Sequence, residues 1–206
     1  MGRPSCPRHL VIFARRPQLG VGKRRLARGA GEIAAWRFQR LMLARLLRRL
    51  GPDPRWTTWL AVTPDRAARN RSWLPAAGAG TVRAIPQGSG DLGRRMARPM
   101  ATLPPGPVVV VGSDIPALGT AQVAAAFQAL GARDAVLGPA DDGGYWLVGL
   151  AARARKRPPF ARVRWSGPHA LADTRRNLER AGMSWHSLAA LSDVDDAGEL
   201  SPAHFR

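Results

Sequence analysis

Asp114 is a carboxylate in a position suited to metal binding, because it follows a run of four valines. The run Val108–Val111 ends in segment 112–116, GSDIP, where Ser113 precedes the carboxylate. Ligands of open α/β sheets bind beyond the carboxyl ends of the strands, and Mg²⁺ takes one or two carboxylates together with substrate phosphates. The segment also fits an Asx-type turn that ends the strand. We expect Asp114 to hold a divalent metal ion and Ser113 to lie beside the substrate.

Two further carboxylates, Asp193 and Asp195, lie near the end of the chain. Alternate residues of an extended segment point to the same side. If this segment folds back against the end of the valine strand, Asp195 can complete a metal site with Asp114. Two acidic residues in a surface turn are the alternative interpretation.

A glycine-rich basic segment, residues 20–26 (GVGKRRL), follows the first predicted strand. It is not a P-loop, because Pro17 stands at the first glycine position and Arg24 stands where a Ser or Thr would bind Mg²⁺. In a flexible loop, its glycine backbone and the charges of Lys23 and Arg25 could hold phosphates. An exposed basic turn is equally compatible with the spacing.

The segment 138–146, GPADDGGYW, joins two short predicted strands. Asp142 could act as a base that accepts a proton from a hydroxyl group, and the glycines after it would let a ligand approach the backbone. Tyr145 and Trp146 would then form a wall of the same pocket. Asp-Gly-Gly between strands is also a strong hairpin signal, so a purely structural turn remains an alternative.

These segments need a scaffold to position them, and the chain predicts one in which strands alternate with helices. Short apolar runs predict the strands, and apolar residues at helical spacing predict the helices. The predicted strands are His9–Ala14, Thr57–Val62, Thr81–Ile85, Val108–Val111, Ala135–Leu137, Tyr145–Val148 and, at an edge, Ser184–Leu188. The predicted helices are Glu32–Leu50, a short one after Thr63, Asp91–Met100, Thr120–Leu130 closed by Gly131, and Gly167–Ala181. The alternation predicts an α/β doubly wound sheet.

Apolar spacing also predicts which faces are buried. The valine run has no alternation, so both faces of that strand should be covered, as in a parallel sheet between two layers of helices. In the helix over residues 32–50, a group of apolar side chains should face the core: Ile33, Trp36, Leu43, Leu47 and Leu50. No internal repeat or long linker divides the sequence, so residues 1–206 are expected to form a single domain.

Composition and charge limit the class of function. The chain has 206 residues, 45% of them hydrophobic, and a formal net charge of +18. Such a charge implies an anionic partner, but every basic residue except Lys23 and Lys156 is an arginine, and the arginines are spread along the chain. This spread argues against a nucleic-acid site. The single cysteine, Cys6, excludes a disulfide framework, and no apolar run approaches the ~18 residues of a membrane span. We expect a cytoplasmic protein.

Six segments in order carry a resemblance to a known family. They are IFARRPQLGVGKRRLA (12–27), QGSGDLGRRM (87–96), VVVVGSDIPAL (108–118), GPADDGGYWLVGL (138–150), FARVRWSG (160–167) and DVDDAGEL (193–200). The chain resembles small bacterial glycosyltransferase-like proteins of the nucleotide-diphospho-sugar transferase (GT-A) superfamily, in particular the group associated with arsenosugar biosynthesis and radical-SAM enzymes. The resemblance implies a three-layer, Rossmann-like α/β fold with a mostly parallel central sheet.

The resemblance also implies roles for particular residues. Lys23 and Arg25 would contact the nucleotide phosphates, and Asp114 and Asp195 would hold Mg²⁺ or Mn²⁺. Two further groups would bind substrate: Gly90 to Gly93, Gly90 and Asp91 in particular, on the nucleobase side, and Asp142, Gly143, Gly144 and Tyr145 on the sugar or acceptor side. The chain departs from the family at Arg24, where the family has a Thr between the two basic residues.

The implied activity is metal-dependent transfer of a sugar from a nucleotide-diphospho-sugar to a small-molecule acceptor, with Asp114 and Asp142 as the catalytic carboxylates. The alternative is a nucleotidyltransferase of the guanylyl- or cytidylyltransferase type, which uses a nucleoside triphosphate and releases pyrophosphate. A third hypothesis, a non-enzymatic polyanion binder, predicts binding that falls steeply with salt. The expected partners of the enzyme are a nucleotide-sugar or nucleotide and a small acceptor, and not a membrane.

Overall fold

The computed structural model describes residues 7–75, 80, 82–194, 196, 198 and 199. Within them, a seven-stranded sheet has the order β3-β2-β1-β4-β6-β5-β7. The strands are β1 (His9–Arg15), β2 (Thr57–Thr63), β3 (Arg83–Pro86), β4 (Val108–Gly112), β5 (Ala135–Pro139), β6 (Tyr145–Leu150) and β7 (Trp185–Ser187). Every predicted strand is present. Of the weakest one, Thr81 lies outside the described residues.

The sheet is mostly parallel, and one strand runs the other way. β1, β2, β3 and β4 are parallel to one another, and β7 is parallel to β5. β6 is antiparallel to both of its neighbours, β4 and β5. The carboxyl ends of β1, β2 and β4 therefore meet at one edge of the sheet, and the β5–β6 turn lies at that same edge.

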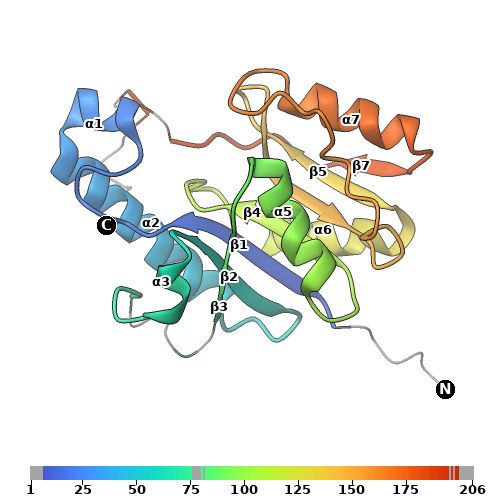
Figure 1. Ribbon diagram of the computed structural model, residues 1–206, viewed down its shortest axis with the longest axis horizontal. Coiled ribbons are helices and arrows are strands. Elements are labelled where there is room, and N and C mark those ends of the chain that lie inside the picture. The colour runs from blue at the N-terminus through green and yellow to red at the C-terminus, as the bar shows by residue number, and fades with distance from the viewer. Residues whose placement is uncertain (1–6, 76–79, 81, 195, 197, 200–206) are drawn as a thin grey trace.

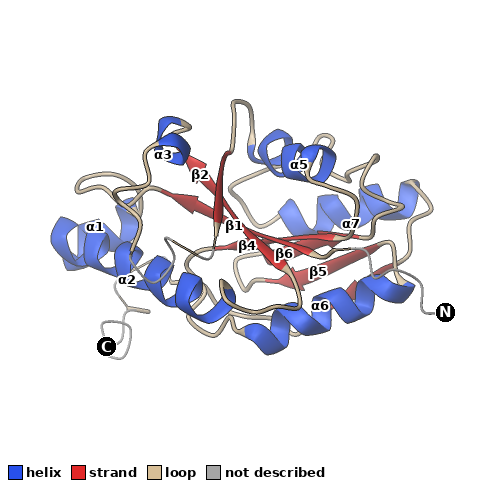
Figure 2. Cartoon of the chain, turned by 90° about the horizontal axis from the view of Figure 1, so that it is seen from below, coloured by secondary structure: helices blue, strands red, loops and turns tan. Residues whose placement is uncertain are grey.

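Helices cover both faces of the sheet and make three layers (Figures 1 and 2). On one face lie α2 (Glu32–Leu50) and α6 (Thr120–Ala132), and on the other lie α5 (Leu92–Thr102) and α7 (Ala170–Arg180). Two short helices, α1 (Arg24–Ala30) and α3 (Arg66–Arg69), stand close to the carboxyl ends of β1 and β2. The three-layer α/β fold expected from the sequence is thus confirmed.

The valine strand β4 joins the two cores, as its lack of alternation predicts. Val109 and Val111 pack into the core under α2 and α6, together with Leu47 and Phe127. Val108 and Val110 pack on the opposite side, under α5 and α7. Successive side chains of a strand point to opposite faces, so a continuous apolar run is required only where both faces are covered.

Helix α2 has the predicted bounds, but its buried face is rotated from the predicted one in the first half. Ile33 is 65% exposed and Trp36 is only half-buried. Ala35, Phe38 and Met42 are buried in their place, against α1 and Val194. The N-terminal half of α2 extends beyond the sheet, so the segment that covers it sets its inner face, and the helix's own periodicity could not reveal that segment.

The remaining differences lie at helix ends. α6 continues past Gly131, and its N-cap is Gly119, whose backbone N–H donates to Gln122 Oε1 at 3.1 Å. α7 begins at Ala170, three residues later than predicted. α5 begins after Asp91 as predicted, because the Asp91 carboxylate accepts the backbone N–H of Arg94 at 2.8 Å and caps the helix.

The end of α5 is fixed by a buried arginine. The Arg155 guanidinium donates to four backbone carbonyls, those of Met100, Leu103, Pro104 and Gly106. These acceptors belong to the last turn of α5 and to the loop that leads into β4. Because α5 also carries residues of the site described below, Arg155 fixes that helix from the end opposite to the site.

His9, at the start of β1, is a buried histidine with defined partners. Its Nδ1 accepts the indole N–H of Trp59 at 3.3 Å, and its Nε2 lies 3.4 Å from the carbonyl oxygen of Pro105. Burial lowers the pKa of His9 below its ordinary value, and the nearby positive charge of Arg155 acts in the same direction. The folded protein therefore holds His9 neutral.

We predict that this histidine makes the protein less stable at acidic pH. As the pH falls below ~6.5, the unfolded chain takes up a proton at this histidine before the folded protein does, because the folded state has the lower pKa. The free energy of unfolding therefore falls, by at most ~1.4 kcal/mol per pH unit. Urea unfolding at pH 7.5 and 5.5 measures this loss. His9→Gln should reduce the difference between the two pH values. His186→Gln, which removes an exposed histidine, should leave it unchanged.

Candidate functional site

A cavity of about 530 Å³ opens at the carboxyl edge of the sheet. The ends of three parallel strands form its floor, through Ala14 of β1, Thr63 of β2 and Gly112 of β4. Helices α1 and α2 line one side, and Leu92 of α5 lines the other. This is the place where open α/β sheets bind their ligands.

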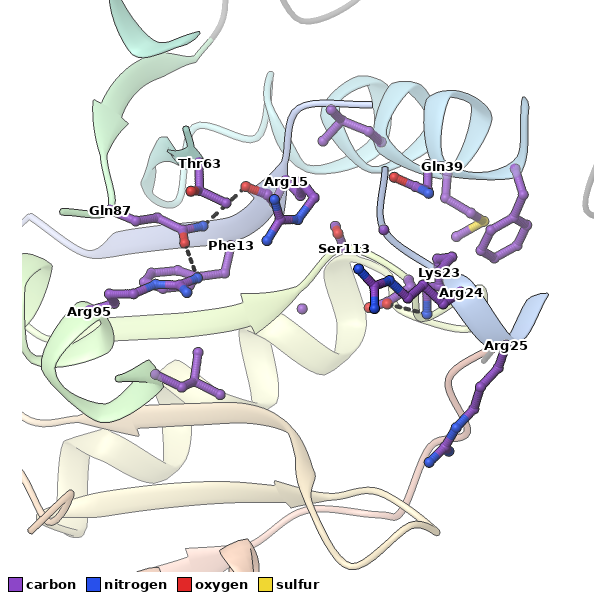
Figure 3. A pocket seen from close by; sticks show the side chains of 18 of the residues that line it. Phe13, Arg15, Lys23, Arg24, Arg25, Gln39, Thr63, Gln87, Arg95 and Ser113 are labelled. Atoms are coloured by element: carbon purple, nitrogen blue, oxygen red, sulfur yellow. Dashed lines mark hydrogen bonds and ion pairs between the residues drawn. The ribbon is translucent and has the colours of Figure 1, made fainter. Parts of the chain in front are cut away.

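The cavity lining is strongly basic. Among the described residues it contains a single carboxylate, Asp114, and six cationic side chains: Arg15, Lys23, Arg24, Arg25, Arg28 and Arg95. In Figure 3, Lys23 and Arg24 lie at one end, Gln87 and Arg95 lie at the other, and Arg15 lies between them. A concave surface with this excess of positive charge attracts an anionic ligand.

The basic segment over residues 20–26 is more ordered than predicted. It was expected to be a flexible loop, but α1 begins within it at Arg24. Lys23 precedes the helix with φ 42° and ψ 48°, a left-handed conformation that costs a non-glycine residue about 1–2 kcal/mol. Its long side chain is 11% exposed and points toward the end of β4. Arg25, by contrast, is exposed and points away from the other labelled basic groups (Figure 3).

Lys23 joins the end of β4 to the C-terminal segment. Its Nζ lies 2.5 Å from Oδ2 of Asp114 and donates to the carbonyl oxygen of Val194 at 2.7 Å. The backbone N–H of Val194 donates to the carbonyl oxygen of Asp114 at 3.2 Å. The C-terminal segment thus folds back against the end of β4, as the metal-site hypothesis requires. Asp195 itself lies outside the described residues.

The same segment is also held to the β5–β6 turn. The backbone N–H of Leu191 donates to the Pro139 carbonyl oxygen at 3.1 Å, and the Ser192 hydroxyl lies 2.5 Å from Asp141 Oδ2. Residues 191–194 therefore run along the carboxyl edge of the sheet from β5 to β4.

The β5–β6 turn is built as a structural hairpin turn. Asp142 is exposed, and its Oδ1 accepts the backbone N–H of Gly144 at 2.8 Å. Gly143 has φ +81°, and a Cβ there would lie 2.4 Å from the Pro168 carbonyl oxygen. A glycine at this position leaves room for the backbone of the neighbouring loop at Pro168. These residues lie at the same sheet edge as the cavity but do not line it.

The two aromatic residues after the turn pack on opposite cores and do not line the cavity. The interpretation of the buried Trp146 as a pocket wall is wrong, whereas a substrate contact of the partly buried Tyr145 stays a prediction. Trp146 is 3% exposed and donates its indole N–H to the Ala189 carbonyl oxygen. Tyr145 packs edge-to-face on Trp165, with ring centroids 6.4 Å apart, and burial raises the pKa of its phenol. Strand alternation sends the two side chains to opposite faces of the sheet, and helices cover both faces.

The structure separates the other predicted substrate residues. Ser113 lines the cavity beside Asp114. Gly90 and Asp91 are exposed and do not line it, and the Asp91 side chain serves as the N-cap of α5. Within the predicted segment Gly90 to Gly93, Leu92 does line the cavity, and so do the neighbouring residues Gln87 and Arg95. Helical spacing from the Asp91 cap could have indicated that Arg95, one turn into α5, points back toward the cap.

The described residues contain no group of three or more His, Cys, Asp and Glu side chains that could hold a metal ion. The oxygens that do converge are Asp114 Oδ2 and the Val194 carbonyl, and the ammonium of Lys23 lies between them. Within the same residues, no helix is long and apolar enough to cross a membrane.

Residues 46–167, more than half of the chain, match a family described as "Uncharacterized protein conserved in bacteria (DUF2064)". The chain belongs to this family. The DUF2064 match contains Gln87, Arg95 and Asp114, whereas Lys23 precedes it.

Solved structures agree with this fold. A Desulfovibrio desulfuricans G20 protein, named as a nucleotide-diphospho-sugar transferase, is 27% identical over 92% of this DUF2064 chain and 82% of its own, with a TM-score of 0.83. A cytidylyltransferase from Leptospira borgpetersenii serovar Hardjo-bovis is 15% identical over 93% and 78%, with a TM-score of 0.57. Glucosyl-3-phosphoglycerate synthase from Mycobacterium tuberculosis was solved with Mn²⁺ and UDP. It is 11% identical over 94% of this chain and 74% of its own, with a TM-score of 0.57. The last two show the fold alone. No curated protein matches the chain.

We predict that Lys23 holds the C-terminal segment of this DUF2064 protein in place. Lys23→Met removes a hydrogen bond from a charged donor, which contributes about 1.5–3 kcal/mol. Amide hydrogen exchange at Val194 should therefore speed up about ten- to hundredfold. Arg24→Met is the matched control, because it removes the adjacent exposed charge without touching Val194. Equal exchange in both variants would contradict the role of Lys23.

Proposed function

We propose that this protein transfers a sugar from a nucleotide-diphospho-sugar donor to a small-molecule acceptor. The observation that carries the proposal is the cavity itself, where six cationic side chains and one carboxylate meet at the carboxyl edge of the sheet. A diphosphate supplies the negative charge that this lining lacks. The 27% identical Desulfovibrio protein supports the same class of donor by its name.

In this proposal the phosphates lie at the end of the cavity formed by α1. Lys23 and Arg24 supply positive charge there, and Arg25 and Arg28 add to it from the rim. Fixed cations around a leaving nucleoside diphosphate offset the charge that develops on it as the glycosidic bond breaks.

The oxygens at the end of β4 fit a divalent cation. Asp114 Oδ2 and the Val194 carbonyl already converge on a positive charge, the ammonium of Lys23. They are hard oxygen donors, which Mg²⁺ and Mn²⁺ prefer, and substrate phosphates complete such sites. We therefore propose that Asp114 holds Mg²⁺ or Mn²⁺, with Asp195 as its second carboxylate. When bound, the ion would neutralise charge on the diphosphate.

The acceptor side is assigned to the β5–β6 turn. In the transfer, the acceptor oxygen forms a bond to the sugar C1, the bond from C1 to the diphosphate breaks, and the acceptor proton passes to a base. Asp141 and Asp142 are both exposed carboxylates of this turn. Because Asp141 already accepts the Ser192 hydroxyl at 2.5 Å, we assign that proton to Asp142. The resemblance to the arsenosugar-associated group supports a small acceptor molecule. Both cores pack on the same sheet, which supports the proposal that residues 1–206 act as one domain.

A nucleotidyltransferase is the second candidate, and the charge of the cavity favours it. Six cations suit a triphosphate at least as well as a diphosphate. In that reaction an acceptor oxygen forms a bond to the α-phosphorus, and pyrophosphate leaves with the broken bond. The cytidylyltransferase with the same fold is compatible with this chemistry.

We predict a metal-dependent thermal shift with one nucleotide class. UDP-, GDP-, CDP-, ADP- and dTDP-sugars are compared with the matching triphosphates, each with Mg²⁺, with Mn²⁺ or with EDTA. A ligand at 100 times its Kd adds ~2.7 kcal/mol, which raises the Tm of a chain of this size by about 5–10 °C. A shift with a diphospho-sugar supports the transferase, and a shift confined to a triphosphate supports the alternative.

The metal-dependent part of the shift should disappear in Asp114→Asn. Asp53→Asn is its control, since Asp53 lies before β2 at the opposite edge of the sheet, where its carboxylate pairs with Arg55 at 2.6 Å. The proposal is wrong if Asp114→Asn keeps the full metal dependence. Binding that does not depend on the identity of the nucleotide and that weakens steeply as the salt concentration rises would instead indicate a polyanion binder.

A further inference from the structure

The second end of the cavity is built around a buried amide. The Gln87 side-chain NH₂ donates to the Ala14 carbonyl oxygen at 3.0 Å and to the Ala61 carbonyl oxygen at 2.8 Å. These acceptors belong to β1 and β2, so the amide bridges the ends of the two strands. Because both of its N–H groups are used, its Oε1 is fixed as an acceptor that faces Arg95.

Arg95 donates a hydrogen bond to that acceptor, and other N–H groups of its guanidinium remain available as donors. Its Nη2 donates to Gln87 Oε1, and its buried Nε–H has no hydrogen-bond partner among the described residues. Burial lowers the pKa of Arg95 from its ordinary value, and the positive charge of Arg15 acts in the same direction. A buried guanidinium N–H without an acceptor costs free energy, which a ligand with an acceptor would recover.

The geometry of the sheet separates Arg95 from the phosphate end. Gln87 sits across the ends of β1 and β2, whereas Lys23 and Asp114 meet at the end of β4, on the far side of β1. Neighbouring strands lie ~4.8 Å apart, so the two ends of the cavity are roughly 5–10 Å from each other. A ribose and one phosphate can bridge such a gap.

We infer that Arg95, positioned by Gln87, reads the nucleobase of the substrate and selects a base edge with two adjacent acceptors. A guanidinium only donates hydrogen bonds, and it does so as a planar fork. Guanine offers such an edge through O6 and N7, and cytosine does so through O2 and N3. Adenine places a donor beside N7, and uracil places N3–H between its two oxygens. This inference rests on the proposed function and narrows its substrate to guanosine or cytidine nucleotides.

Calorimetric titration of CDP, GDP, UDP and ADP in the presence of Mg²⁺ tests the inference. A bidentate arginine–base pair discriminates by about 1–3 kcal/mol, or roughly 5- to 150-fold in Kd. The wild-type protein should prefer CDP or GDP by a factor in this range, and the preferred nucleotide identifies the base. Arg95→Met should abolish the preference while changing the affinity for UDP and ADP little.

Two further variants separate base recognition from a mere effect of charge or folding. Arg94→Met removes the adjacent exposed arginine and should keep the preference. Arg95→Lys keeps the positive charge but loses the fork, so it should lose the preference and retain the affinity for inorganic pyrophosphate. Thermal unfolding confirms that each variant is folded.

Three results would overturn the assignment of Arg95. They are equal binding of all four nucleotides by the wild-type protein, an unchanged preference in Arg95→Met, and an equal loss for every nucleotide and for pyrophosphate, which would indicate a phosphate contact. If the wild-type protein binds none of the four, the proposed function fails and this inference fails with it.

Discussion

The contact of Lys23 with Asp114 and Val194 joins three parts of the chain that are far apart in the sequence. The segment after β1, the end of β4 and the C-terminal segment meet at this one ammonium group. The backbone of Lys23 turns left-handed before α1, and its side chain points toward the end of β4. The cavity therefore depends on a charge that is largely withdrawn from water. Any ligand of Asp114 has to share that carboxylate with Lys23 or displace the ammonium.

Two groups among the arginines of this chain have different physical roles. Arg155 is buried and caps backbone carbonyls, and the Arg164 guanidinium beside Asp173 holds the pKa of that carboxyl well below its usual range. Such residues fix loops and helix ends. The cationic side chains of the cavity, by contrast, face one carboxylate between them. Net charge alone could not separate the two groups, because every arginine adds one positive charge to the total of +18, whatever its role.

Most of the fold could be predicted from the sequence, because the decisive signals are local. The uninterrupted valines of β4 and the cap at Asp91 each depend on neighbours within a few residues. The site could be predicted only in part. The positions of Lys23, Ser113 and Asp114 follow from their places after strands. Arg95 instead reaches the cavity from α5 through its hydrogen bond to Gln87, whose side chain is held by β1 and β2. The burial of Trp146 could not be predicted, because a glycine-rich turn gives no information on which helices cover the next strand.

The reversed direction of β6 has a consequence for how such proteins diversify. The parallel half of the sheet, β1 to β4, supplies the floor of the cavity, and its geometry is fixed by strand ends that cannot lengthen independently. The β5–β6 turn reaches the same edge from an antiparallel hairpin and presents the exposed side chains of Asp141 and Asp142 there. Substitution of these exposed side chains could therefore change what is delivered to the cavity, while the strand ends that form its floor keep their positions. One half of the sheet thus fixes the shape of the cavity floor, and the other half carries the turn whose side chains can change.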